Sequence, residues 1–139
     1  MNSQVIDEEQ NPDREIKDDN KEIERICLSR KCLVANSSNI NFDKAVKGCL
    51  VRITLQSTGD HKDYKIGEIV DVIEKPLYYK VENKDINKYL LVKIGKEIKE
   101  FKILFISSKP TQGLELSYYL RELTNSGVPR PTLRQIREK

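Results

Sequence analysis

Gly48-Cys-Leu-Val-Arg-Ile-Thr-Leu55 is followed, after a short polar segment, by Tyr64-Lys-Ile-Gly-Glu-Ile-Val-Asp-Val-Ile73. Both stretches alternate apolar with polar residues, which is the pattern of strands that are buried on one face. The intervening residues 56–63 are turn-forming types and contain one glycine, so the two strands are predicted to form a β-hairpin.

The register of the hairpin follows from the position of its turn. A turn centred on Thr58 and Gly59 places apolar side chains opposite one another on the sheet. The predicted pairs are Val51 with Ile66, Ile53 with Tyr64, and Arg52 with Lys65. Like charges directly opposite each other on a sheet are destabilising. The pairing of Arg52 with Lys65 therefore has two interpretations: an anion lies between the two cations, or both side chains extend into water.

The other elements are predicted from periodicity and from turn residues. Residues 1–20 are polar and acidic and are predicted to form a disordered tail, because they cannot bury enough apolar surface to offset the entropy of ordering. Residues 21–139 are predicted to form one domain. Its further elements are a helix from Lys21 to about Ala35, a short helical turn or linker over 41–47, strands at Tyr78–Val81, Lys88–Ile94 and Glu97–Ile106, and helices at Gln112–Ser126 and from Thr132 to Ile136.

Several short strands joined by tight turns are typical of a small, strongly bent sheet or barrel. The sequence therefore predicts an α+β fold, in which a small antiparallel sheet is flanked by an N-terminal helix and two C-terminal helices. The final helix is expected to begin with a capping box, because Thr132 is followed three residues later by Gln135.

The charge of the chain is unevenly distributed. Its net charge is +3, but residues 1–24 carry nine acidic and three basic side chains, and the other 115 residues carry 22 basic and 13 acidic ones. A basic domain with an acidic tail predicts an anionic partner, either nucleic acid or a phosphorylated chain. No apolar run approaches the length of a membrane-spanning helix, so we expect no membrane partner.

Catalysis and metal binding are not expected. The three cysteines, Cys27, Cys32 and Cys49, fit no disulfide framework and predict a reducing, intracellular compartment. With His61 as the single histidine, the chain offers neither a usual zinc spacing nor a base for a nucleophilic cysteine or serine. It also lacks the glycine-rich phosphate loops and the Gly-x-Ser-x-Gly motif. We therefore expect no enzyme activity, no metal and no cofactor.

Three cations are the candidate phosphate-binding residues: Arg30, Arg52 and Lys65. An arginine binds phosphate through two parallel hydrogen bonds, and a lysine adds a mobile point charge. Phosphothreonine carries nearly two negative charges together with a methyl group. A cluster of arginines beside an apolar group is therefore its expected complement.

Apolar and aromatic residues near these cations are the candidates for pocket or stacking support: Leu50, Tyr64 and Tyr79. Tyrosines beside cations also form platforms for single-stranded bases, so a nucleic-acid site on a basic face is an alternative. The lysines expected on that face are Lys80, Lys84, Lys88 and Lys93. A third interpretation is a protein–protein scaffold, in which the cations are solvated and the tyrosines lie at the edge of the core.

Taken in order, these residues resemble the Plus-3 domain, a module named for three positively charged residues and found in a subunit of the polymerase-associated elongation complex. Plant proteins that combine this module with other chromatin-type domains are also similar. The matching positions, over residues 22–139, are Leu28-Ser-Arg30, Val46–Ile53, Tyr64-Lys65, Glu68-Ile69, Tyr79, Asn87-Lys88, Leu90, Phe101, Ile106-Ser107, Pro131-Thr132 and Ile136.

The resemblance implies a Tudor-like barrel, no catalytic activity, and a nuclear protein of transcription elongation and chromatin. Family members of the elongation-complex type bind phosphorylated repeats of an elongation factor, and also single-stranded DNA. The resemblance therefore implies that a phosphothreonine-containing repeat peptide binds at the three positive positions, which fall on Arg30, Arg52 and Lys65. Single-stranded DNA or RNA is the alternative partner, and the chain is expected to be a monomer.

Overall fold

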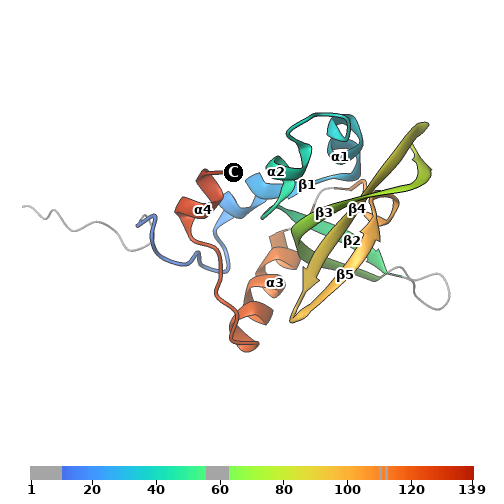
Figure 1. Cartoon of the computed structure of the whole chain (residues 1–139). Coiled ribbons are helices and arrows are strands. Elements are labelled where there is room, and N and C mark those ends of the chain that lie inside the picture. The colour runs from blue at the N-terminus through green and yellow to red at the C-terminus, as the bar shows by residue number, and fades with distance from the viewer. Residues whose placement is uncertain (1–10, 56–62, 110, 112) are drawn as a thin grey trace, which may run out of the picture.

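The structure is a computed structural model that describes residues 11–55, 63–109, 111 and 113–139 (Figure 1). The predicted hairpin turn at Thr58 and Gly59 lies outside the described residues. In chain order the elements, with η marking a 3-10 helix, are η2 (Lys21–Ile26), β1 (Cys27–Leu28), α1 (Arg30–Asn36), α2 (Phe42–Val46), β2 (Leu50–Leu55), β3 (Asp63–Val81), β4 (Lys84–Ile94), β5 (Glu97–Lys102), η3 (Ile103–Phe105), α3 (Gly113–Asn125) and α4 (Leu133–Arg137).

The five strands form one sheet in the order β1-β2-β3-β4-β5. Strand β1 runs parallel to β2, and the other neighbours are antiparallel. After β5 the chain returns to β2, where Ile106 forms an isolated antiparallel bridge with Ile53. The α+β class is therefore confirmed, but the sheet that was predicted to be antiparallel contains one parallel pair.

Strands β2 and β3 pair one residue away from the predicted register. Arg52 lies opposite Ile66, and Lys65 lies opposite Ile53. Because successive side chains of a strand point to opposite faces, Arg52 and Lys65 lie on opposite faces of the sheet. The predicted pairing of Arg52 with Lys65 is therefore wrong. The apolar pattern did not fix the register, because β2 buries side chains on both of its faces.

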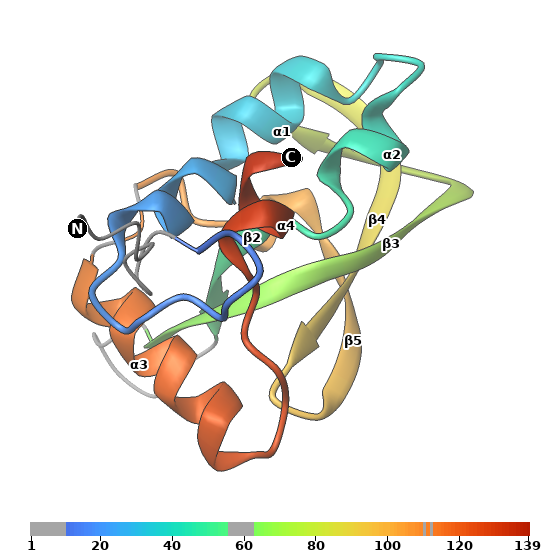
Figure 2. The ribbon, with the colours of Figure 1, turned by 90° about the vertical axis from the view of Figure 1, so that its left-hand side faces the viewer.

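Two hydrophobic cores lie on opposite faces of β2. In Figure 2, α1 and α2 lie together at the top of the molecule and α3 lies at the bottom. The first core packs Val51 and Ile53 against α1, α2 and the buried faces of β3 and β4. The second core packs Leu50 and Ile66 against α3, α4 and η2. Because successive side chains of β2 point to opposite faces, this strand packs against both layers of helices.

The predicted N-terminal helix from Lys21 to Ala35 is not a single helix. It is replaced by η2, the short strand β1, and α1. Strand β1 pairs Cys27 with Leu50, so the backbone is extended at a position where the spacing of apolar residues predicted a continuous helix. Ser29 then begins α1, because its side-chain oxygen accepts a hydrogen bond from the Cys32 amide at 3.2 Å. Pairing with β2 has overridden the local helical periodicity.

The strands after the hairpin also differ from the prediction. Pro76 lies within β3, where the register shifts between Glu74 and Tyr79, and it does not end the strand. Proline is tolerated at such an irregularity because no ladder hydrogen bond requires its missing amide proton. The predicted strand at Tyr78–Val81 is therefore the last part of β3. Strand β5 ends at Lys102, earlier than predicted, and η3 follows it.

Two helices are present near the C-terminus. Helix α3 buries one face, formed by Leu116, Tyr119, Leu120 and Leu123. The backbone then turns at Gly127, whose φ of +72° lies in the left-handed region that glycine adopts without steric cost. Helix α4 begins with the expected capping box, in which Thr132 and Gln135 each bond the backbone amide of the other.

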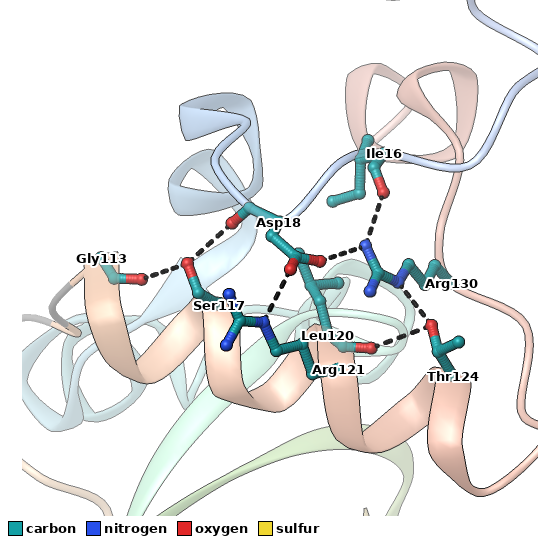
Figure 3. A network of polar contacts seen from close by, with 8 residues as sticks. All are labelled: Ile16, Asp18, Gly113, Ser117, Leu120, Arg121, Thr124 and Arg130. Atoms are coloured by element: carbon teal, nitrogen blue, oxygen red, sulfur yellow. Dashed lines mark hydrogen bonds and ion pairs between the residues drawn. The ribbon is translucent and has the colours of Figure 1, made fainter.

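Residues 11–20 pack against the domain, which differs from the prediction of a tail up to residue 20. Ile16 is 3 % exposed, and its amide donates to the Pro131 carbonyl at 3.0 Å. The Asp18 carboxylate accepts a hydrogen bond from Arg121 Nε at 2.8 Å and forms an ion pair with Arg130 Nη1 at 2.6 Å. Figure 3 shows both arginines pointing toward this carboxylate. The Ser117 hydroxyl donates to the Asp18 carbonyl at 2.8 Å. We name Asp18, Ser117, Arg121 and Arg130 the Asp18 clamp.

Ion pairs with the C-terminal region explain why residues 11–20 are ordered although their acidic composition predicted disorder. Acidic side chains of the N-terminal region meet arginines of the C-terminal region: Asp13 pairs with Arg134, and Glu22, in η2, pairs with Arg137. The predicted disorder of residues 1–10 concerns residues outside the described ones.

Gly67 is predicted to be intolerant of any side chain. A Cβ at this position of β3 would lie 2.5 Å from Val92 Cγ1 and 2.9 Å from the Lys93 carbonyl oxygen. We expect Gly67→Ala to lower the free energy of unfolding by about 1–3 kcal/mol, the usual cost of overpacking. Gly113→Ala is the control, because a Cβ there meets nothing within 4 Å. Urea denaturation that leaves the two variants equally stable would contradict this prediction.

Acid is predicted to weaken the N-terminal contacts. Hydrogen bonds from Arg121 and Arg130 lower the pKa of Asp18 below its ordinary 3.8. A carboxyl group with a lowered pKa stabilises the folded state above its unfolded pKa, and this contribution is lost as the pH falls through the folded value. Thermal denaturation should therefore separate wild type from Asp18→Asn at about pH 7 and separate them less at about pH 3. A difference that is constant with pH would contradict the assignment.

Candidate functional site

Arg52 is enclosed by three groups on the second-core face of β2. Its Nε lies 3.0 and 2.9 Å from the two carboxylate oxygens of Glu115, in the first turn of α3. Its Nη1 donates to the Ser107 hydroxyl at 3.0 Å, and its guanidinium carbon lies 3.5 Å from the ring centroid of Tyr64. The Arg52 side chain is 12 % exposed. We name Arg52, Tyr64, Ser107 and Glu115 the Arg52 site.

Ser107 links this site to the start of α1. Its amide donates to the Arg52 carbonyl at 2.7 Å, and its own carbonyl accepts from the Arg30 amide at 3.2 Å. Ser107 is 7 % exposed and follows the bridge between Ile53 and Ile106. The return of the chain to β2 therefore brings the backbone of Arg30 and the guanidinium of Arg52 to the same residue.

The Arg30 guanidinium points toward a different acid. Its Nε lies 3.4 Å from Glu82 Oε1, and the two side chains are 29 % and 38 % exposed. Glu82 lies in the turn between β3 and β4 and has a φ of 49°. A long, partly exposed ion pair of this kind contributes little to stability. The Arg30 side chain is thus held weakly, although its backbone is fixed beside Ser107.

Lys65 is not brought to Arg52. It shares a face of the sheet with Ile53, and its side chain is exposed. The predicted convergence of the three cationic groups is therefore not observed: the Arg52 guanidinium and only the backbone amide of Arg30 meet at Ser107, while the Arg30 guanidinium pairs with Glu82 and Lys65 lies on the other face of the hairpin.

The predicted support residues have different environments. Tyr64 lies against the Arg52 guanidinium, as described above. Leu50 is 2 % exposed and belongs to the second core. The Tyr79 ring packs edge-to-face on Tyr89 with centroids 5.2 Å apart; its hydroxyl donates to the Lys88 carbonyl and accepts from the Ile103 amide at 3.0 Å. Burial raises the pKa of Tyr79. Leu50 and Tyr79 thus contribute to packing and hydrogen bonding within the fold, and neither lies in the Arg52 site.

The four lysines of the predicted nucleic-acid face do not form one exposed stripe. Lys88 is 13 % exposed and lies 2.9 Å from Asp43. The Lys84 ammonium donates to the Val34 carbonyl at 3.0 Å. Lys80 is exposed but lies 3.7 Å from Asp85, and Lys93 is half-buried opposite Glu68. Two of the four ammonium groups are therefore committed to contacts inside the fold.

Sequence reasoning missed two functional candidates, Ser107 and Glu115. Ser107 stood in the family motif but had no predicted role. Glu115 gave no local signal, because it lies 63 residues from Arg52 in the chain. Only the packing of α3 on the second core brings its carboxylate to the guanidinium.

No metal site is found within the described ranges. No group of three His, Cys, Asp or Glu side chains there is arranged to hold an ion. Burial raises the pKa of Cys27 to about 11, which suppresses its thiolate. None of the described helices is long and apolar enough to cross a membrane.

Arg52 is predicted to stabilise the fold in a way that lysine cannot replace. A lysine ammonium cannot simultaneously bond Glu115, bond Ser107 and stack on Tyr64. We expect Arg52→Lys to lower the free energy of unfolding by about 1.5–3 kcal/mol, the contribution of charge-assisted hydrogen bonds. Lys65→Ala should change it by less than about 0.5 kcal/mol. Equal losses for the two variants in urea denaturation would refute the distinction.

The family model described as Plus-3 domain matches residues 22–124, which span the segment from η2 into α3. This match contains every residue of the Arg52 site together with Arg30 and Lys65. Plus-3 domains are binding modules associated with transcription-related proteins, and they are not a known enzyme family. Because the match covers more than half of the chain, this protein belongs to the Plus-3 domain family.

Proposed function

We propose that this domain is a non-catalytic module that recognises a phosphothreonine-containing peptide of a transcription-elongation factor in the nucleus. The observation that carries the proposal is that Ser107 contacts both the backbone amide of Arg30 and the guanidinium of Arg52, so that Arg30 lies near the Arg52 site. Family membership supplies the transcription context.

The chemistry of the two arginines suits a phosphate. The Arg52 guanidinium is 12 % exposed, so an anion that reaches it is weakly screened by water and salt. Its planar donors match phosphate oxygens, and Tyr64 fixes the plane of the group. Arg30 is held at Glu82 by one long contact of 3.4 Å, so its side chain turns toward a stronger anion at small cost.

Lys65 has a secondary place in this proposal. Its charge lies on the other face of the hairpin and serves to attract the peptide, not to bond the phosphate. The curvature that brings Ile106 back to Ile53 supports a Tudor-like barrel as the architecture that presents the site. No metal or cofactor enters the proposed recognition.

Single-stranded nucleic acid is the less supported partner. A nucleic-acid groove needs exposed cations along the backbone path and aromatic faces open to the bases. Lys88 is largely buried and Tyr79 uses its ring and hydroxyl within the fold. A scaffold without phosphate dependence remains the outcome that a failed titration would indicate.

Phosphate-dependent binding is the test of this function. A peptide with one phosphothreonine and its unphosphorylated twin are titrated calorimetrically against wild type, Arg30→Gln and Arg52→Gln, each first verified as folded. We expect the phosphate to raise affinity, and each arginine variant to lose about tenfold or more of that affinity, because each removes a charge-assisted contact. Lys96→Gln, at an exposed position of the β4–β5 turn, should bind as wild type does.

Equal affinity of wild type for the two peptides would end the phosphate proposal. In a parallel titration with single-stranded DNA, losses of affinity spread evenly over variants of Lys80, Lys84, Lys88 and Lys93, with a steep salt dependence, would instead indicate a nucleic-acid surface.

A further inference from the structure

The Arg52 guanidinium already holds an anion that belongs to the chain itself. Both oxygens of Glu115 lie within 3.0 Å of Arg52 Nε. Carboxylate and phosphate oxygens accept hydrogen bonds from a guanidinium in the same planar arrangement. An external phosphate that approaches Arg52 from the side of Nε would therefore meet the position that Glu115 holds.

We infer that Glu115 is an internal competitor, which occupies the phosphate position at Arg52 and is displaced when the peptide binds. This inference rests on the proposed phosphate recognition and adds its regulation. Phosphothreonine brings nearly two negative charges against the single charge of Glu115, so the exchange favours the external ligand. The Glu115 side chain is 28 % exposed, so water can receive it when it leaves Arg52.

The position of Glu115 at the start of α3 makes a local release feasible. A Cβ at Gly113, the first residue of the helix, would meet nothing within 4 Å, so there is open space beside the start of this turn. The buried residues of α3 begin at Leu116. The first turn can therefore move Glu115 away while the rest of the helix stays packed on the second core.

The Asp18 clamp holds the helix just beyond this turn. Ser117 and Arg121 contact Asp18 from the second and third turns of α3 (Figure 3). The clamp fixes the helix axis, and so it positions Glu115 within reach of Arg52. Asp18 is thus a positioning residue for the competitor, and the N-terminal segment is joined to the phosphate site through α3.

An internal competitor has a quantitative signature. It reduces the fraction of domains that are competent to bind, so it lowers the apparent affinity for every phosphate ligand by the same factor. Removing its charge should then raise the affinities for inorganic phosphate and for a phosphothreonine peptide by equal factors. A residue that merely shapes the peptide groove would change the peptide affinity alone.

Calorimetric titration of both ligands against wild type and Glu115→Gln tests the inference at fixed ionic strength. We expect the variant to bind about tenfold or more tightly, with the same factor for the two ligands, since one charge-assisted contact is removed. Glu122→Gln makes the same charge change at an exposed position of α3 and should leave both affinities unchanged within about twofold. Asp18→Asn should shift both affinities in the direction of Glu115→Gln, by a smaller factor.

A measurement on wild type covers the case in which Glu115→Gln does not fold. Inorganic phosphate, titrated into the labelled protein, should shift the amide resonances of Glu115 and its helical neighbours together with the Arg52 side chain. Resonance shifts at Arg52 without any at Glu115 would overturn the inference that Glu115 competes with phosphate for Arg52.

The outcomes separate the two proposals. If wild type binds the phosphorylated peptide preferentially and Glu115→Gln binds no better, the competitor fails and phosphate recognition stands. If only Glu115→Gln responds to phosphate, the wild-type domain does not recognise phosphate, and the displacement of Glu115 by a bound peptide is overturned as well. If neither protein responds to either ligand, both proposals fail.

Discussion

Strand β2 is the element on which the two hydrophobic cores of this domain depend. Val51 and Ile53 point into the first core, and Leu50 points into the second. A strand that is buried on both faces leaves no direction in which a charged side chain reaches bulk water freely. Burial of apolar side chains on both faces stabilises the domain. It also requires that Arg52, in the middle of the strand, finds partners within the protein for its charge and its hydrogen-bond donors.

That requirement explains the construction of the Arg52 site. Removing a guanidinium from water is costly unless its charge and its donors are satisfied. Glu115 supplies the opposite charge, Ser107 an acceptor, and Tyr64 an aromatic face. These partners come from α3, the segment after η3, and β3, so the ion pair also ties the helical layer to the sheet. A cation that is held with fixed geometry near the surface is suited to recognise an anion.

The charge asymmetry of the chain has a structural role as well. The acidic N-terminal segment neutralises arginines near the C-terminus, through Asp13 with Arg134 and Asp18 with Arg121 and Arg130. These pairs hold Ile16 in place beneath them, where it joins the second core. The acidic N-terminal segment and the basic C-terminal region thus bind each other within the folded domain.

The sequence alone determined the alternating strands, the amphipathic face of α3, the capping box of α4 and the residues that mark the family, because each depends on neighbours close in the chain. It did not determine the register of β2 and β3, since apolar residues on both faces of β2 made two registers acceptable, and a shift of one residue moved Lys65 away from Arg52. It also gave no signal for the contact of Glu115 with Arg52 or of Asp18 with Arg121. Those contacts join residues far apart in the chain, and only the packing of α3 between the sheet and the N-terminal segment brings them together.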